Sequence, residues 1–187
     1  MNSPLASQHV FINSSSPSTV VCPPELVFVN AHLAFLLTQN AFLFDGEEQY
    51  QAFLRLLASL GEHSFHLVEN LGATLSESRL PYTACLSVES TYAQFQEVVE
   101  AFDPPFGFII NHFYLFGQNP NWGIYLCELP TITIIGCAPE LQQEFAHVFA
   151  IEGNGYEVLR EFIGREFQTV PELQTLFEQN YKLLDGC

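Results

Sequence analysis

Three β-rich segments in the second half of the chain, joined by short connections, constrain the fold more than any other feature. They are residues 106–116, 122–127 and 131–135, and the sequences Gly-Gln-Asn-Pro-Asn and Glu-Leu-Pro separate them. Short connections of this kind favour antiparallel neighbours. The sequence therefore predicts an antiparallel sheet in this region.

Further strands and several helices are expected on either side of these segments. Residues 25–29, 64–68 and 82–88 have the composition of strands, whereas the apolar run 30–37 suits either a strand or a buried helix. Residues 70–81 have the Gly, Ser and Pro content of a loop. Five segments are predicted to be helices, namely residues 47–60, 91–102, 139–149, 156–167 and 171–184.

Capping residues mark the helix boundaries. Asp45 and Glu48 have the spacing of a reciprocal cap before the first helix, and Gly61 suits the end of that helix. Ser90 or Thr91 is expected to cap the second helix. These patterns predict an α+β fold, mainly an antiparallel sheet with amphipathic helices packed on it and a helical C-terminal end.

The domain boundaries follow from composition. Residues 1–24 are rich in Ser, Asn and Pro around one short apolar island at residues 9–12. We therefore expect a flexible N-terminal arm over residues 1–24, with room for one edge strand, and a single α+β domain over residues 25–187.

The charge balance is the most unusual compositional feature. The chain has 21 acidic and five basic residues and a formal net charge of −16. Such an excess repels nucleic acids and anionic membranes and favours encounter with a basic protein partner. Solubility offers an alternative explanation, because a chain with 18 Phe needs surface charge to stay in solution.

Cysteine and histidine usage excludes several other classes of function. The five cysteines are irregularly spaced, and no apolar run approaches the roughly 18–20 residues of a membrane helix. We therefore expect a cytoplasmic protein without a membrane span.

No Cys-x-x-Cys or His-x-x-x-His pair occurs, and Glu152-Gly-Asn-Gly155 lacks the lysine of a phosphate-binding loop. Neither a metal site nor a cofactor is expected.

The only tryptophan, Trp122, follows a turn and begins a strand in which it alternates with Gly123, Tyr125 and Cys127. Packing in the core is the leading interpretation, because large aromatic residues usually anchor sheets. The alternative is a binding anchor, since Trp and Tyr are common at interface hot spots, and Tyr114 and Tyr125 are then its expected exposed neighbours.

Cys137 is the best candidate nucleophile in the chain. It follows a predicted strand at the start of a predicted helix, where free N–H groups and the helix dipole lower the pKa of a thiol. A small buried thiol is the commoner role for such a cysteine.

The leading functional hypothesis is a noncatalytic, bacterial-type interaction protein that binds a basic partner, as an immunity protein or inhibitor masks a basic toxin or nuclease. The candidate binding residues are the aromatic side chains Trp122, Tyr114 and Tyr125 and the carboxylates Glu140, Glu144, Glu157 and Glu161. The alternatives are a small hydrolase or transferase that uses Cys137, and a structural subunit of a larger assembly. Carboxylates in the leading hypothesis steer association, and a few aromatic residues hold the complex together.

Overall fold

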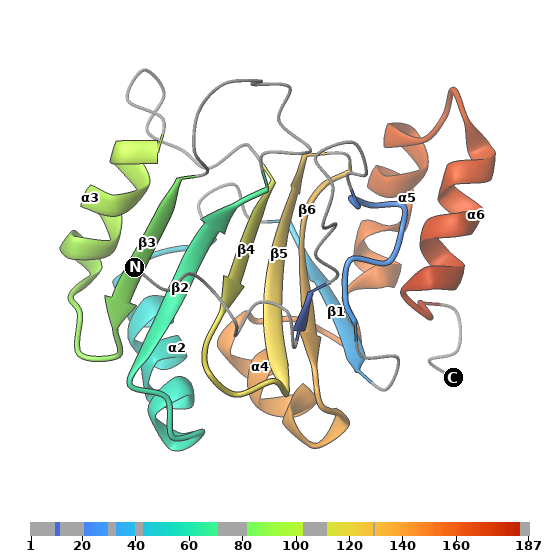
Figure 1. Cartoon of the computed structure of the whole chain (residues 1–187). Coiled ribbons are helices and arrows are strands. Elements are labelled where there is room, and N and C mark those ends of the chain that lie inside the picture. The colour runs from blue at the N-terminus through green and yellow to red at the C-terminus, as the bar shows by residue number, and fades with distance from the viewer. Residues whose placement is uncertain are drawn as a thin grey trace.

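The computed structural model describes residues 10–11, 21–29, 33–39, 43–70, 82–102, 112–128 and 130–183. Its centre is one six-stranded antiparallel sheet with the strand order β1-β6-β5-β4-β2-β3 (Figure 1). The strands are β1 (Ala34–Thr38), β2 (Ser64–Glu69), β3 (Thr83–Ser87), β4 (Phe113–Phe116), β5 (Trp122–Glu128) and β6 (Thr131–Cys137). The predicted fold class is confirmed, and the short connections do join antiparallel neighbours, β4 to β5 and β5 to β6.

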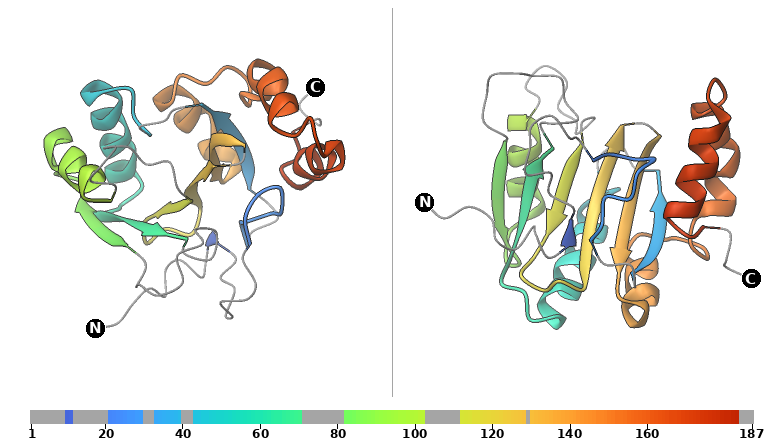
Figure 2. Two further views of the ribbon diagram at one scale, coloured as in Figure 1. Left: turned by 90° about the horizontal axis from the view of Figure 1, so that it is seen from above. Right: turned by 45° about the vertical axis from the view of Figure 1, so that its right-hand side comes forward.

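Helices cover the sheet on one face and stand beside its β1 edge. The helices are α2 (Glu47–Ser59), α3 (Tyr92–Phe102), α4 (Gln142–Val148), α5 (Tyr156–Glu166) and α6 (Pro171–Asn180), and a 3₁₀ turn at Pro139–Leu141 precedes α4. Seen from above, α2, α3 and α4 lie along one face, whereas α5 and α6 lie beyond β1 (Figure 2). The ambiguous run 30–37 contributes β1, a strand, and places it at the edge of the sheet.

The period-two alternation of the strands divides the core into two layers. Trp122, Ile124 and Leu126 face the layer built with α2, α3 and α4. The intervening residues Tyr125 and Cys127 face a second layer, which α5, α6 and the N-terminal segments fill. Because both layers are apolar, the central strands carry buried apolar side chains on both faces of the sheet. A strand with one solvent-exposed face would instead alternate apolar and polar residues.

Three capping predictions have different outcomes. The backbone N–H of Gln94 donates to the Thr91 hydroxyl at 3.2 Å, and that of Thr91 donates to Gln94 Oε1 at 2.8 Å, so Thr91 caps α3. Gly61 ends α2 with φ +79°, as predicted. The predicted pair of Asp45 with Glu48 is wrong, because Gly46 is the N-cap of α2 and the N–H of Asp45 donates to Gln49 Oε1 at 2.7 Å.

Several of the described N-terminal residues, among them Val10, Phe11 and Phe28, belong to the core. Val10 and Phe11 are buried against Gly123, and the ring of Phe28 packs on Gly136, the cross-strand partner of Gly123. The two glycines leave the sheet surface flat enough for these side chains. The loose arm expected over residues 1–24 therefore does not include Val10 and Phe11.

Two other sequence expectations need comment. The strand expected at residues 25–29 is wrong, since this segment forms only an isolated bridge between Phe28 and Phe11. Most of the loop predicted over residues 70–81, and residues 106–111 of the first β-rich segment, lie outside the described residues.

Candidate functional site

Trp122 is a core residue and not an exposed anchor. It is fully buried, and its ring lies 5.8 Å from that of Phe53 and 6.1 Å from that of Phe145, measured between centroids. Its indole Nε1–H donates to the buried carboxylate of Glu62 at 2.9 Å. The core interpretation of Trp122 is the one that the structure supports.

The carboxylate of Glu62 organises the β4–β5 turn around Trp122. Besides the indole, it accepts hydrogen bonds from the backbone N–H groups of Gln118 and Asn119, both at 2.8 Å. Its oxygens lie against the Cα of Gly117, where a Cβ has no room. Three hydrogen-bond donors from described residues therefore stabilise this buried carboxylate. Sequence reasoning missed this role, since nothing local links Glu62 to a turn more than fifty residues away.

The expectation that Tyr114 and Tyr125 are exposed is wrong. Tyr114 is 8% and Tyr125 0% exposed, and both lie in the second core layer. The Tyr125 hydroxyl accepts a hydrogen bond from Asn70 Nδ2 at 3.2 Å and lies 2.9 Å from His112 Nδ1. Burial lowers the pKa of His112 to about 4 and raises that of Tyr125, so both groups are neutral at pH 7. This polar network is internal and presents no aromatic ring to a partner.

Cys137 lacks the environment of an activated nucleophile. Its side chain is fully buried, and burial raises the pKa of its thiol to about 12, with a further contribution from the carboxylates of Glu144 and Glu140. The predicted lowering of this pKa by the helix start is therefore wrong. The pKa of the thiol rises because desolvation and two nearby negative charges outweigh the helix dipole, which is weak here since the helix is short and begins with a 3₁₀ turn.

The four predicted carboxylates do not form one cluster. Glu140 and Glu144 lie near Cys137 at the start of α4, whereas Glu157 and Glu161 lie on α5, and all four are exposed. Only Glu157 lines the large surface hollow of the molecule described next.

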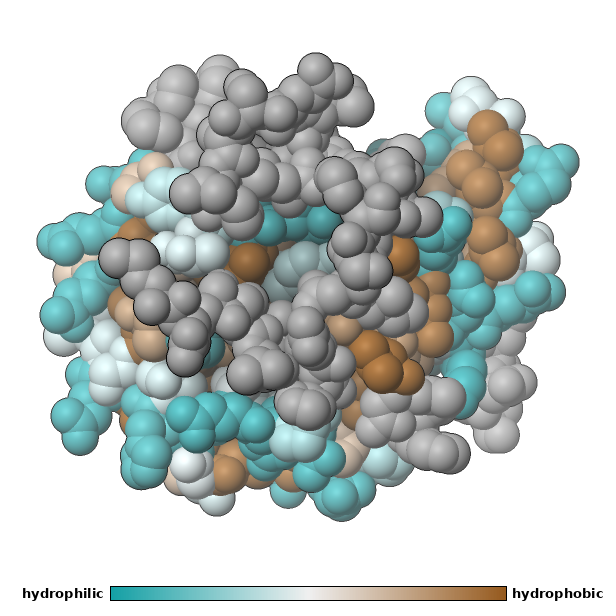
Figure 3. Space-filling view, in the orientation of Figure 1, coloured by the Kyte–Doolittle hydropathy of each residue, from teal (hydrophilic) through white to brown (hydrophobic). Residues whose placement is uncertain are grey.

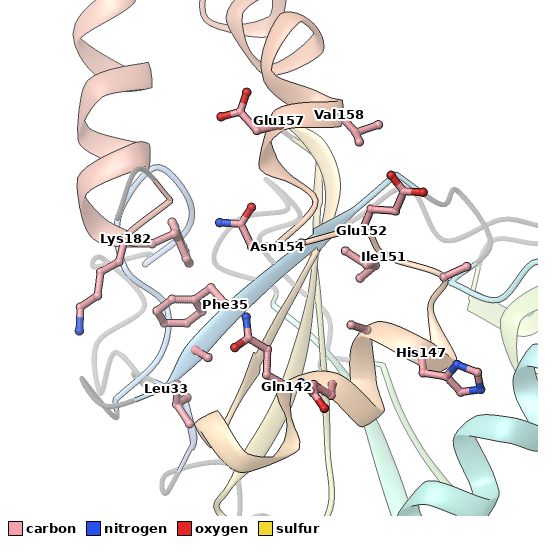
Figure 4. Close-up of a pocket in the computed structure, with 16 residues that line it drawn as sticks. Leu33, Phe35, Gln142, His147, Ile151, Glu152, Asn154, Glu157, Val158 and Lys182 are labelled. Carbon is pink, nitrogen blue, oxygen red and sulfur yellow. The ribbon is translucent and has the colours of Figure 1, made fainter. Parts of the chain in front are cut away.

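This hollow is a groove of about 1300 Å³ that follows the outer edge of β1. One wall comes from α4, including Gln142 and Ala146, and the other comes from the end of α6, including Tyr181 and Lys182. Figure 4 shows β1 crossing the groove, with Lys182 and His147 on opposite sides of the strand. The volume exceeds the roughly 300–1,000 Å³ of typical small-molecule pockets. The groove has the size of a site for a polypeptide segment.

Among the described residues, only part of the β1 edge is covered by other parts of the chain. The N–H of Leu37 points away from β6 and donates to the carbonyl of Asn154 at 2.8 Å, and Gly155 packs on the Leu37 carbonyl. Backbone groups of alternate residues in an antiparallel strand point to the same side, so those of Phe35 also point outward, into the groove. Within the described residues, the N–H and C=O of Phe35 have no backbone hydrogen-bond partner on that side.

Two carboxylates and an exposed apolar side chain surround this edge. Glu152 and Glu157 line the groove, and Val158 beside them is 72% exposed. A second hollow of about 520 Å³ on the other side of the 151–155 loop shares Glu152 and Val158 with the groove. Sequence reasoning missed Glu152 as a candidate, since residues 152–155 were considered only as a phosphate-binding loop, for which they lack the lysine.

The other exposed apolar side chains are less concentrated. A strip of hydrophobic side chains lies over α6 in the space-filling view, where Val170 and Leu176 are the exposed ones (Figure 3). A small exposed apolar strip of this kind is common on folded proteins and does not by itself indicate a partner. The β1 groove, which combines backbone groups, charge and apolar surface, is the stronger candidate.

Neither a cluster of metal-ligating side chains nor a membrane-spanning helix is found in the described parts of the chain. Within residues that the structure describes, no three His, Cys, Asp or Glu side chains are arranged to hold a metal ion. None of the described helices has both the length and the apolar character required to cross a membrane.

Comparison of the chain with protein-family models, with curated proteins and with solved structures gave no significant match. The function is therefore argued from the geometry of this chain, and the β1 groove is its candidate functional site.

Proposed function

We propose that this protein is a noncatalytic interaction domain that binds a basic segment of a protein partner in the β1 groove. The role resembles that of an immunity protein or inhibitor that masks a basic toxin or nuclease. The observation that carries the proposal is that a sheet edge left incompletely paired by the described residues lies in one groove with Glu152, Glu157 and exposed Val158.

The electrostatics support a cationic partner. The net charge of −16 attracts a positive surface over a long range, and the two groove carboxylates align the basic side chains of the bound segment. Each exposed charge pair contributes about 0.2–1 kcal/mol, so the affinity depends on apolar and backbone contacts as well. Cys22, Cys85 and Cys137 are free thiols, which suits a reducing compartment such as the cytoplasm.

The two alternative functions have less support. An enzyme that uses Cys137 needs an accessible thiolate, whereas this thiol is buried and its pKa is raised to about 12. A self-assembling structural subunit has to bring together copies that each carry a net charge of −16, which repel one another.

Affinity capture with two charge-matched double variants tests the proposal. Glu152→Lys/Glu157→Lys reverses the charge in the groove, and Glu97→Lys/Glu100→Lys makes the same change in net charge on the exposed side of α3, at the other end of the sheet. We expect the wild type and the α3 variant to retain a basic protein at low salt. The groove variant should bind it about 2 kcal/mol more weakly, roughly 30-fold, because attraction becomes repulsion at two positions.

The captured protein is then identified by mass spectrometry, purified and titrated against all three forms at low and high salt. Equal binding by the groove and α3 variants, or affinity that does not change with salt, contradicts the proposal.

A further inference from the structure

Among the described residues, the unpaired part of the β1 edge is short. It is centred on the outward-facing backbone groups of Phe35, because Asn154 already occupies the position opposite Leu37. An unpaired edge is normally protected by charge, a bulge or a covering segment, since it can otherwise pair with another chain. Here the 151–155 loop covers one end of β1 and leaves the other end facing the groove.

The walls of the groove suit the two faces of an added strand. Side chains of a β-strand alternate between opposite faces of the sheet, and β1 lies between α4 on one face and the end of α6 on the other. A strand beside β1 therefore directs alternate side chains toward Ala146 of α4 and toward Lys182, just beyond the end of α6. At the Asn154 end it meets Glu152 and Glu157.

We propose that the partner segment binds by β-strand addition, pairing its backbone with Phe35 of β1 and placing a basic side chain at Glu152 and Glu157. This inference rests on the proposed function and specifies its binding mode. Backbone hydrogen bonds contribute affinity in this mode, and the alternating side chains contribute specificity. The position of Asn154 sets where the added strand ends.

A basic segment is the occupant that the charges favour, because two carboxylates, Glu152 and Glu157, line the groove among the described residues together with one cationic side chain, Lys182. A second copy of the chain would bring another Glu152 and Glu157 to the same groove, within an overall charge of −16 on each copy. Like charges in contact are unfavourable, whereas a cationic strand is attracted over a distance set by the salt concentration.

A model peptide tests the binding mode directly. The probe is a seven-residue peptide of alternating Lys and Val with blocked ends, and its control is the same peptide N-methylated at every residue, which keeps the charge and lacks backbone donors. Binding to the ¹⁵N-labelled full chain is followed by NMR titration at low salt, with amide hydrogen exchange at Phe35. We expect the Phe35 amide to exchange at least tenfold more slowly when the peptide is bound.

The variants and the control peptide separate strand addition from charge attraction. The methylated peptide should bind the wild type at least tenfold more weakly than the unmethylated one. Glu152→Lys/Glu157→Lys should weaken binding of the unmethylated peptide at least tenfold, whereas Glu97→Lys/Glu100→Lys should leave it within about twofold.

Each contrary result has a definite meaning. Equal binding of both peptides, unchanged exchange at Phe35, or no binding of the unmethylated peptide overturns strand addition, while the capture experiment with the charge variants decides the proposed function separately. Slower exchange at Phe35 with rising protein concentration alone, together with a doubled mass by light scattering, identifies a second copy as the occupant and also overturns the inference.

Discussion

The carboxylate of Glu62 joins the only tryptophan to the β4–β5 turn, so its removal should destabilise the fold measurably. In Glu62→Ala, three donors lose their acceptor, namely the buried indole of Trp122 and the backbone N–H groups of Gln118 and Asn119. A buried unsatisfied donor costs about 1–3 kcal/mol, and the two turn amides regain part of that from water, so we expect a loss of about 4 kcal/mol.

Glu62→Gln should cost less, because an amide oxygen still accepts two of these hydrogen bonds. Its NH₂ group then faces a backbone N–H, and the loss of that hydrogen bond together with the charge costs about 2 kcal/mol. Trp122 is the only tryptophan, so its fluorescence follows urea unfolding from within the affected site, and far-UV circular dichroism tests two-state behaviour. Glu97→Gln on α3 is the exposed control and should change stability by less than about 0.5 kcal/mol.

Gly117 provides an independent check on the same geometry. A Cβ at this position would collide with the Glu62 carboxylate, so Gly117→Ala should destabilise the wild type but add little in the Glu62→Ala background. Additive effects of the two substitutions, or equal stability changes in Glu62→Gln and Glu97→Gln, would refute the role assigned to Glu62.

Three further predictions follow from buried or strained groups. Folding lowers the pKa of His112 from 6.5 to about 4, so between these pH values the imidazole is protonated in the unfolded chain and neutral in the folded one. The free energy of unfolding is therefore highest above about pH 6.5 and falls toward pH 4, by at most about 3 kcal/mol. His112→Gln should show a shallower pH dependence of the urea midpoint, and a parallel profile argues against this. Alkylation followed by mass spectrometry should modify exposed Cys85 well before buried Cys137, whose pKa is raised; the reverse order would restore the nucleophile hypothesis. Ala150 ends α4 with φ +51°, a conformation that favours glycine, so Ala150→Gly should raise the unfolding free energy by about 0.5–1 kcal/mol, and a lower melting temperature would contradict this.

Local sequence patterns predicted much of the secondary structure. The alternation in residues 122–127 assigned Trp122 and Tyr125 to opposite faces of a strand, and the structure has them in different core layers. Short turns specified β4, β5 and β6 as antiparallel neighbours. These features depend on residues close together in the chain, where period, turn chemistry and capping act directly.

The candidate site was harder to predict because long-range packing builds it. Periodicity identified the face on which Tyr125 lies, but not that α5, α6 and the N-terminal segments cover this face. The helix start beside Cys137 predicted a lowered pKa, whereas burial and the carboxylates of Glu144 and Glu140 raise it. The surroundings of Cys137 in the folded chain therefore affect its pKa more than the adjacent helix start does.

The sequence by itself determined the fold class, most element boundaries, the charge and the alternation of the strands. Only the tertiary structure decided that β1 pairs with β6, a strand about a hundred residues away, and thereby lies at the edge of the sheet. An edge exists only once the strand order is set, and strand order depends on non-local pairing that local propensity does not encode. For that reason the groove, with Phe35, Glu152 and Glu157 around it, emerged from the fold and from no motif in the sequence.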